Sequence, residues 1–342
     1  MSVLALIGWP LAALAMSLAL VRAAIGYTRR HGMLDQPGRR RSHDVPTPRG
    51  GGIGIVLAVM VCAPAALITA SPAWSHLIAV TLAGALALVA LVGWWDDRRS
   101  LPVLPRLAAQ AIAVAALSLV LVHGQVSSAW LLLLLPLGVW SINLHNFMDG
   151  IDGLLALQGM FVAVALGVLA WSVGQAALAA ATAVLALATF GFWIFNRPPA
   201  RIFMGDVGSG SMGLLIFAFG AMLWRVDTSM VWPILIVSSA FNVDAGLTLA
   251  TRMLRGRRWY TAHREHLYQW LVRRGVTHAR TGAAYLGWNV LVAAPMAWLA
   301  SVRPTAALAT CMFTHFFAAG LWLLLKRRLA RRHPLKVRHV TA

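Results

Sequence analysis

The chain has 342 residues, of which 60% are hydrophobic and only 11% are charged, and its mean hydropathy is +0.74. This composition excludes an ordinary soluble globular protein. The net charge of +19 does not indicate nucleic-acid binding, because the basic residues lie in loops that alternate with apolar stretches. Both cysteines, Cys62 and Cys311, lie inside apolar stretches, so they indicate neither a disulfide framework nor a cysteine-based metal site.

Apolar stretches that could cross about 30 Å of hydrocarbon as helices recur along the whole chain. They predict an all-α fold, a polytopic bundle of about eleven transmembrane spans forming one integral-membrane domain over residues 1–342. The first span has no basic residue before Arg22, which is the wrong polarity for a cleaved signal peptide. The expected spans are 3–25, 51–70, 77–94, 107–123, 129–143, 154–173, 175–194, 211–225, 230–250, 281–301 and 305–325.

Lysine and arginine are concentrated in alternate loops. Of the 29 basic residues, 26 lie in the segments 26–50, 95–106, 195–210, 251–280 and 326–342. The positive-inside rule places these segments in the cytoplasm, with the N-terminus outside and residues 326–342 as a basic cytoplasmic tail. Together with the inner loop between the fifth and sixth spans, these segments hold all of the ten acidic residues except Asp227 and Asp244, so we expect a functional site on the cytoplasmic face.

The first inner loop joins a cluster of arginine and histidine to three consecutive glycines before a span. Arg49 precedes Gly50, Gly51 and Gly52, whose backbone N–H groups would point at an anion at a helix N-terminus. A flexible hinge is an equally good interpretation of the glycines.

The second inner loop begins with two adjacent carboxylates, Asp96 and Asp97. Such a pair at the end of a transmembrane helix favours a divalent-cation site or a base of raised pKa. The alternative is that Arg98 and Arg99 simply pair with them.

The segment between the fifth and sixth spans carries two asparagines and two aspartates: Asn143, Asn146, Asp149 and Asp152. If this segment were helical, the two aspartates would face the same way. Polar groups of this kind at a membrane boundary indicate a functional site, and a plain polar turn is the alternative.

The fourth inner loop places Asp206 between two glycines directly before a span. Its carboxylate and the N–H groups of Gly208 and Ser209 favour a magnesium-bound phosphate. It is not a Walker A loop, because the Gly-Lys-Ser/Thr ending is absent.

The fifth inner loop is rich in arginine and contains His263-Arg264-Glu265-His266. This order is not the His-Glu-x-x-His of zinc peptidases, so phosphate binding is favoured over zinc. Asp244 precedes this loop, and the sequence leaves open whether it pairs within the bundle or reaches the site.

Together these loops resemble the bacterial polyprenyl-phosphate N-acetylhexosamine-1-phosphate transferases of glycosyltransferase family 4. The last loop lacks the three consecutive histidines of the phospho-MurNAc-pentapeptide translocase, so the resemblance is closer to the O-antigen-initiating branch. The matching pieces are Leu34-Asp35-x-Pro37 with Arg40 and His43, Pro48-Arg49-Gly50-Gly51, Asp96-Asp97, the segment 143–154, Phe195-Asn196, Pro199-Ala200, Phe203-Met204-Gly205-Asp206-x-Gly208-Ser209, and Arg252 with His263-Arg264-Glu265-His266.

The resemblance implies the transfer of N-acetylhexosamine-1-phosphate from a UDP-sugar to undecaprenyl phosphate. The reaction would release UMP and start a lipid-linked glycan, such as O-antigen, at the cytoplasmic face of the bacterial inner membrane. The resemblance also implies Mg²⁺, or Mn²⁺ in its place, with Asp206 as the metal ligand. It leaves open whether the lipid attacks directly or a carboxylate attacks first, and whether the enzyme is a homodimer.

The resemblance further implies roles for the remaining residues. Asp96 or Asp97 would take the proton of the lipid phosphate, and Asp149 and Asp152 would serve the nucleotide side of the site. The expected substrate-binding residues are Arg49, Asn143, Asn146, Asn196, Phe203, Arg252, His263 and His266. The competing function is a transporter of an anionic solute, which the clustering of charge on one face argues against.

Overall fold

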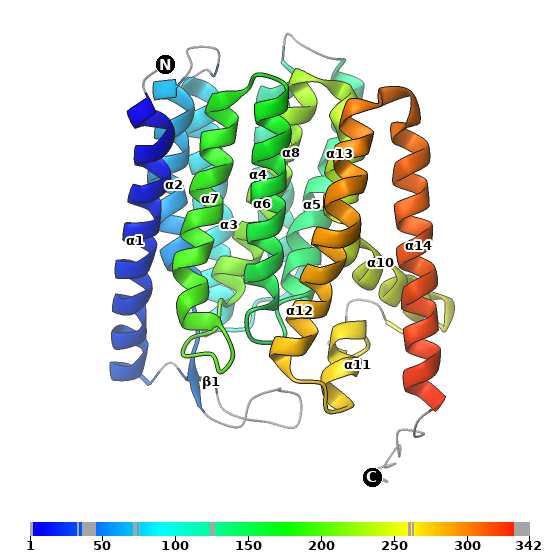
Figure 1. Cartoon of the computed structure of the whole chain (residues 1–342). Helices are drawn as coiled ribbons and strands as arrows, with labels where there is room; N and C mark the ends of the chain where they lie inside the picture. Colours follow the sequence, from blue (N-terminus) through cyan, green and yellow to red (C-terminus); the bar gives the residue numbers. More distant parts are fainter. Residues whose placement is uncertain are drawn as a thin grey trace.

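The structure is a computed structural model that describes residues 3–32, 34–35, 46–70, 74, 76–123, 127–258, 261 and 263–331. The described part is a bundle of long helices with one two-stranded sheet (Figure 1). Apolar segments become helices here because a helix satisfies its own backbone hydrogen bonds where no water is available. The elements are α1 (Val3–Arg30), β1 (Leu34–Asp35), β2 (Thr47–Pro48), α2 (Ile53–Ala70), α3 (His76–Arg98), α4 (Val103–Val122), η1 (Ser128–Trp130), α5 (Leu131–Phe147), α6 (Leu154–Ser172), α7 (Ala176–Asn196), α8 (Asp206–Val226), η2 (Thr228–Met230), α9 (Val231–Val237), α10 (Ser239–Leu254), α11 (Leu267–Arg273), α12 (His278–Trp288), η3 (Asn289–Ala293), α13 (Ala294–Val302) and α14 (Pro304–Arg331).

The number of spans agrees with the sequence-based prediction. Among the described residues, 10 helices are long and apolar enough to cross a membrane, and the bent pair α9–α10 brings the number to 11. The protein is therefore a multi-pass membrane protein with an all-α fold. Helix α1 begins at the upper end of the bundle in Figure 1, and α14 ends at the lower end.

The ninth span is not the straight helix expected over residues 230–250. It bends by 74° between Thr228–Val237 and Ser239–Leu254. A straight continuation would carry the carboxylate of Asp244 along an apolar helix, whereas the bend turns α10 toward hydrogen-bond donors on α11, α12 and α14.

Several helices extend beyond their expected spans toward the same end of the bundle, and two of these extensions carry aspartates of the candidate site. Helix α3 continues from residue 94 to Arg98, and α8 begins at Asp206 rather than at residue 211. Hydropathy marks the length inside hydrocarbon, whereas a helix can continue into the polar boundary. As a result Asp96, Asp97 and Asp206 lie on helical turns rather than in loops. The predicted basic tail likewise begins inside α14, which runs to Arg331, and the residues after it lie outside the described part.

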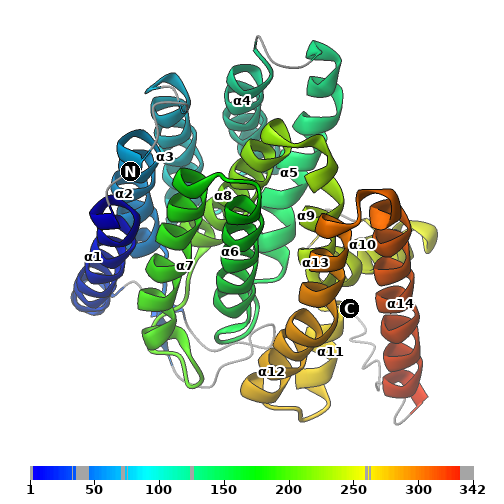
Figure 2. The ribbon, with the colours of Figure 1, turned by 45° about the horizontal axis from the view of Figure 1, so that its top comes forward.

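Helix α8 occupies the centre of the bundle and is buried along its whole apolar length. Figure 2 shows it in the middle of the bundle, with α3, α5, α6 and α7 around it. The N-terminus of α8 lies at the end of the bundle where α3, α5 and α7 end. We call this end, the lower one in Figure 1, the acidic face.

A short irregular layer at the acidic face holds the start of α8. Strands β1 and β2 pair antiparallel, with Leu34 opposite Pro48. The segment before α8 continues this pairing, because the N–H of Phe203 donates to the carbonyl oxygen of Pro48 at 2.8 Å and the N–H of Gly52 donates to that of Met204 at 2.9 Å. A Cβ on Gly52 would lie 2.3 Å from the Cα of Gly208, so only glycine fits there. Of the family motif, Pro37, Arg40 and His43 lie outside the described residues.

Candidate active site

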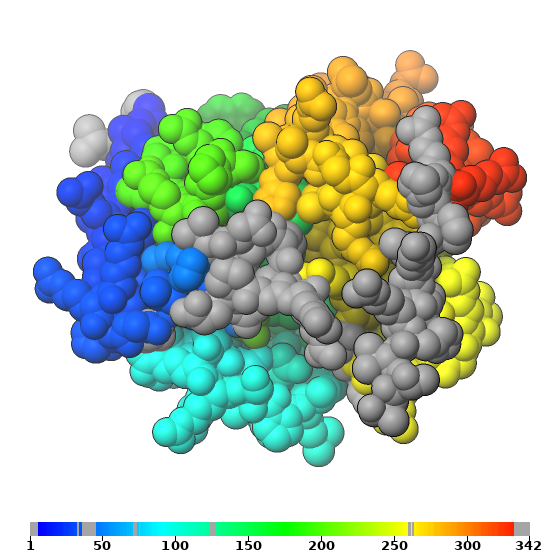
Figure 3. Space-filling model, turned by 90° about the horizontal axis from the view of Figure 1, so that it is seen from below, coloured from blue at the N-terminus to red at the C-terminus, as the bar shows by residue number. Residues whose placement is uncertain are grey.

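Four aspartates from three parts of the chain meet at the acidic face. Asp96 and Asp97 end α3, Asp149 lies in the turn after α5, and Asp206 begins α8. Figure 3 looks onto this face, where the ends of α1, α3 and α7 and the segment α11–α12 surround its middle. The fold thus brings these four aspartates together at one end of the bundle, as the sequence predicted.

Asp97 fixes the start of α8. Its carboxylate accepts the N–H of Asp206 at 2.9 Å and the N–H of Val207 at 3.1 Å, and Arg49 Nε lies 2.9 Å from Oδ1. The side chain is only 5% exposed. A carboxylate on free N–H groups at a helix N-terminus is stabilised by hydrogen bonds and by the helix dipole. Asp97 therefore positions Asp206.

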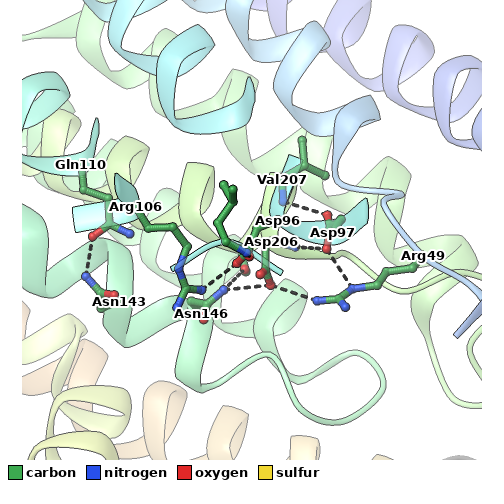
Figure 4. Close-up of polar contacts among 11 residues, drawn as sticks. Arg49, Asp96, Asp97, Arg106, Gln110, Asn143, Asn146, Asp206 and Val207 are labelled. Atoms are coloured by element: carbon green, nitrogen blue, oxygen red, sulfur yellow. Dashed lines mark hydrogen bonds and ion pairs between the residues drawn. The ribbon is translucent and has the colours of Figure 1, made fainter. Parts of the chain in front are cut away.

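Asp206 is the centre of the hydrogen-bond network in Figure 4. Its Oδ1 accepts from Arg49 Nη2 and from Asn146 Nδ2, each at 3.0 Å. The same Asn146 nitrogen lies 3.0 Å from the hydroxyl of Ser209, one turn into α8. The structure thus brings together Arg49, Asn146 and Asp206, three residues that the sequence proposed from separate loops.

Asp96 differs from its neighbour Asp97 in what it contacts. It accepts from Arg106 Nη1 and from the N–H of Leu101, each at 2.6 Å. Asp96 also lines, with Asp206, a small cavity of about 40 Å³ between α3, α4, α5 and α8. Asp96 thus forms an ion pair with Arg106, and Asp97 forms one with Arg49.

Arg106 and Gln110 belong to this cavity, and sequence reasoning gave them no role. Gln110 Oε1 accepts from Asn143 Nδ2 at 2.6 Å, and that nitrogen also donates to the carbonyl oxygen of Val139 at 2.8 Å. The spacing of Arg106 and Gln110 in the sequence could have indicated that both belong to the site. Residues four apart share a helix face, and both are polar on a largely apolar helix.

The segment after α5 is a turn, so Asp149 and Asp152 do not share a helical face. Asp152 accepts the N–H of Ala200 at 3.1 Å and lies 3.3 Å from His278 Nδ1, the first residue of α12. It ties the turn, residues 148–153, to two other elements. We call this segment the Asp149 turn.

Asp149 faces the carboxylate cluster instead. Burial is the main reason why the pKa of its carboxyl is raised to about 7; Arg49 lowers this pKa, and the nearby charges of Asp206 and Asp97 contribute to raising it. The same carboxylates raise the pKa of the Arg49 guanidinium, although burial opposes them as the largest single effect. Arg49 is thus a permanent cation between three carboxylates.

Asn196 and Phe203, expected near the substrate, both make structural contacts. Asn196 is buried, and its Oδ1 accepts the N–H of Gly153 at 3.0 Å while its Nδ2 donates to the carbonyl oxygen of Ile202 at 2.9 Å. Phe203 pairs through its backbone with the β2 segment. These contacts hold the Asp149 turn and the start of α8 in a fixed relation.

The last loop brings its two histidines together, their ring centroids 4.9 Å apart. His266 is buried with its ring stacked on Tyr268. Within the described part of the chain, the Nδ1 atoms of both histidines are buried without a hydrogen-bond partner. Burial lowers the pKa of His263 to about 4 and also lowers that of His266, so both rings are neutral at pH 7.

Arg252 holds the loop that carries these histidines. It forms an ion pair with Glu265, and its Nη2 donates to the carbonyl oxygen of Arg258 at 2.8 Å and to the hydroxyl of Thr261 at 3.2 Å. Arg252 is buried, so a charge without these partners would be costly. The loop is therefore tied to α10.

Acidification should destabilise the protein through His263. Its pKa is about 4 in the folded state against about 6.5 in an unfolded chain. The unfolded state therefore binds the proton first, and stability falls as the pH drops from about 6.5 toward 4. Thermal melts in detergent at pH 7 and pH 5 should show a smaller loss for His263→Gln than for the wild type. His76→Gln, at the opposite end of α3, should behave as the wild type; equal losses in all three proteins would refute the assignment.

The donor set around Asp206 fits a magnesium ion. Among the described residues, no group of three His, Cys, Asp or Glu side chains is arranged to hold a metal. Magnesium, however, usually takes one or two carboxylates and completes its shell with water and substrate phosphates. Asp206, whose carboxylate lines the small cavity beside Asn146, meets that requirement.

The comparisons with known proteins identify the family of this chain. The model of glycosyl transferase family 4 matches residues 77–224. The decaprenyl-phosphate N-acetylglucosaminephosphotransferase of Mycolicibacterium smegmatis is 31% identical, over 79% of this chain and 77% of the relative. The chain belongs to glycosyl transferase family 4.

Other members of family 4 match at similar levels. A probable undecaprenyl-phosphate N-acetylglucosaminyl 1-phosphate transferase of Bacillus subtilis is 29% identical over 72% of each chain. The phospho-N-acetylmuramoyl-pentapeptide-transferase of Lactiplantibacillus plantarum is 28% identical over 62% of this chain and 72% of the relative. The matched residues include Asp96, Asp97, Asp149 and Asp206, so these four aspartates lie inside the part of the chain that the family model matches.

Proposed function

We propose that this protein transfers N-acetylhexosamine-1-phosphate from a UDP-N-acetylhexosamine to undecaprenyl phosphate and releases UMP. The observation that supports it most is the network of Asp206, Asp96, Arg49 and Arg106 at one end of a membrane bundle. The named relatives act on polyprenyl phosphates and sugar phosphates. We place the reaction at the cytoplasmic face of the bacterial inner membrane, because the basic last turns of α1, α3 and α14 lie at the acidic face.

The chemical task is to bring two anionic phosphates together. The lipid phosphate oxygen becomes bonded to the phosphorus that carries the sugar, and the bond from that phosphorus to UMP breaks. Mg²⁺, held by Asp206 together with water and the substrate phosphates, would supply positive charge for both phosphates. The guanidinium groups of Arg49 and Arg106 are fixed beside the carboxylates, and Arg suits bidentate contacts with phosphate.

We assign the lipid phosphate to Asp96 rather than to Asp97. Both oxygens of Asp97 accept N–H groups of α8, so this side chain is already used for positioning. Asp96 lines the cavity beside Arg106 and is placed to take the remaining proton of the lipid phosphate. His263 and His266, neutral and without a hydrogen-bond partner at Nδ1 among the described residues, would form hydrogen bonds with the UDP-sugar.

An apolar cavity supports a lipid acceptor. It has a volume of about 490 Å³ and lies between α5, α8 and the bent span α9–α10. Leu133, Leu137, Phe217 and Trp232 are among the residues that line it. We assign part of the prenyl chain to this cavity, because it is nearly all apolar and lies at membrane depth.

The last loop supports a glycan-initiating role, such as the first step of O-antigen synthesis. Its His263-Arg264-Glu265-His266 differs from the three histidines of the peptidoglycan-precursor enzymes. The transporter alternative has less support, because the acidic network lies at one end of the bundle and the matched relatives are named transferases.

The test uses purified protein in detergent with undecaprenyl phosphate, magnesium and a panel of UDP-N-acetylhexosamines. We expect UMP and a lipid-diphospho-sugar, both followed by mass spectrometry, and the best donor identifies the sugar. Release of UDP would instead indicate a glycosyl transferase that moves only the sugar. No product from folded protein with any donor would favour a transporter.

Chelation should stop the same reaction. EDTA is expected to abolish UMP release, and excess Mg²⁺ or Mn²⁺ to restore it, because two repelling phosphates need added positive charge. The control is folded protein after EDTA treatment, checked by size-exclusion chromatography. Activity that resists the chelator would remove the metal from the mechanism.

A further inference from the structure

Asp244 is a buried carboxylate away from the acidic cluster, and nothing in the proposed chemistry uses it. It is 1% exposed and lies on α10, after the bend in the ninth span. A charge at such depth is costly unless it is fully hydrogen-bonded. Its hydrogen-bond partners therefore indicate its role in the structure.

Three other elements donate to this carboxylate. The N–H of Leu267, at the start of α11, and the indole Nε1 of Trp322 on α14 donate to Oδ1 at 2.7 and 2.9 Å. The hydroxyl of Tyr285 on α12 donates to Oδ2 at 2.7 Å. The Asp244 carboxylate on α10 thus links α12 and α14 to the beginning of α11.

The beginning of α11 carries groups of the candidate site. We call residues 263–268 the His266 turn. Within it, the hydroxyl of Tyr268 donates to the carbonyl oxygen of Phe147 at 3.0 Å. A Cβ on Gly150 would lie 2.1 Å from that hydroxyl, so Tyr268 is seated directly against the Asp149 turn. The ring of Phe147 also stacks on that of His266.

Helix α14 holds the other side of the His266 turn. The ammonium group of Lys326 lies 4.2 Å from the ring centre of Trp270 and 5.0 Å from that of Trp322, and it donates to the carbonyl oxygen of Glu265. Trp322 and Lys326 are four apart on one helix, so α14 contacts this turn through both Asp244 and Glu265.

We propose that Asp244 is a positioning residue that fixes the His266 turn against the Asp149 turn from inside the bundle. It contacts no substrate and acts through Leu267 and Tyr268. The inference rests on the proposed transferase reaction only for its kinetic test. It gives the bend of the ninth span a role, because the bend turns the carboxylate toward these partners.

The kinetic test compares Asp244→Asn with the wild type. Asparagine keeps the shape but loses the charge and one acceptor, so we expect kcat per folded molecule to fall at least about 30-fold through misplacement of the two turns. The fold-decrease in kcat should exceed the fold-change in KM. Trp322→Phe and Tyr285→Phe, which each remove one donor, should lose less. Thr310→Val, on α14 and bonded only within its own helix, should match the wild type.

A double variant tests the route. If Asp244 acts through Tyr268, then Asp244→Asn combined with Tyr268→Phe should lose little more than the more damaging single variant. Additive losses would overturn the route. A wild-type kcat in Asp244→Asn, or a loss explained entirely by unfolded protein, would overturn the positioning role.

Hydrogen exchange supplies a readout that needs no activity. In Asp244→Asn, the amides of the His266 turn and of the Asp149 turn should exchange faster, while those of α1 and α2 stay unchanged. Unchanged exchange in both turns would overturn the proposal. If the wild type had no transferase activity but Asp244→Asn still showed this exchange pattern, the proposed function would be refuted. The positioning of the two turns by Asp244 would remain supported.

Discussion

Asp206→Asn should lower turnover at least about a thousand-fold while leaving the bundle folded. Asparagine can still accept hydrogen bonds from Arg49 and Asn146, and the backbone N–H of residue 206 still reaches Asp97. What disappears is the negative charge proposed to hold Mg²⁺. The measurement is UMP release, normalised to folded protein by size-exclusion chromatography and a thermal melt.

The matched control is Asp227→Asn. Asp227 lies at the opposite end of α8 and accepts the N–H of Ser229, a contact far from the acidic face. Its substitution should keep activity near the wild-type value. Near-normal product formation by folded Asp206→Asn would contradict the assignment of Asp206 as the metal ligand.

Gly93→Ala should lower activity by about a hundred-fold or more, because a small displacement at a reacting site has a large effect. A Cβ at Gly93 would lie 2.5 Å from the carbonyl oxygen of Asp206, so α3 and the start of α8 would have to separate. That separation stretches the hydrogen bonds from α8 to Asp97 and moves Asp206 relative to Asp96. A lower melting temperature should accompany the loss.

Gly84→Ala provides the comparison within the same helix. A Cβ there meets nothing within 4 Å, and alanine favours a helix more than glycine does. We expect wild-type activity and an unchanged or slightly higher melting temperature. If both alanine variants behaved alike, the close approach of α3 and α8 would not be what sets the site geometry.

The sequence predicted the spans well, because crossing the hydrocarbon requires long apolar helices and hydropathy measures that directly. It also predicted that the acidic residues lie at one end of the bundle, because alternate loops of a helical bundle lie on the same face. The family motifs then selected Asp96, Asp149 and Asp206 within those loops, although their individual roles stay predictions.

The sequence could not separate the roles of neighbouring residues. Asp96 and Asp97 differ only in which elements they meet, and that depends on how α3 and α8 pack. Asp149 and Asp152 contact different parts of the protein because the segment that carries them turns instead of continuing the helix. The bend of the ninth span and the partners of Asp244 were equally hidden, since those partners lie 23 to 78 residues away along the chain.

The anchoring of the His266 turn to α14 has a consequence for protein engineering. A chimera that exchanges only residues 252–268 between relatives, in order to change the preferred sugar, would transplant the turn without its supports. Asp244, held by Tyr285 and Trp322, and Lys326 would then meet a foreign backbone. A graft from Asp244 to the end of α14 keeps these partners together, so exchanges of donor preference should be designed as this larger block.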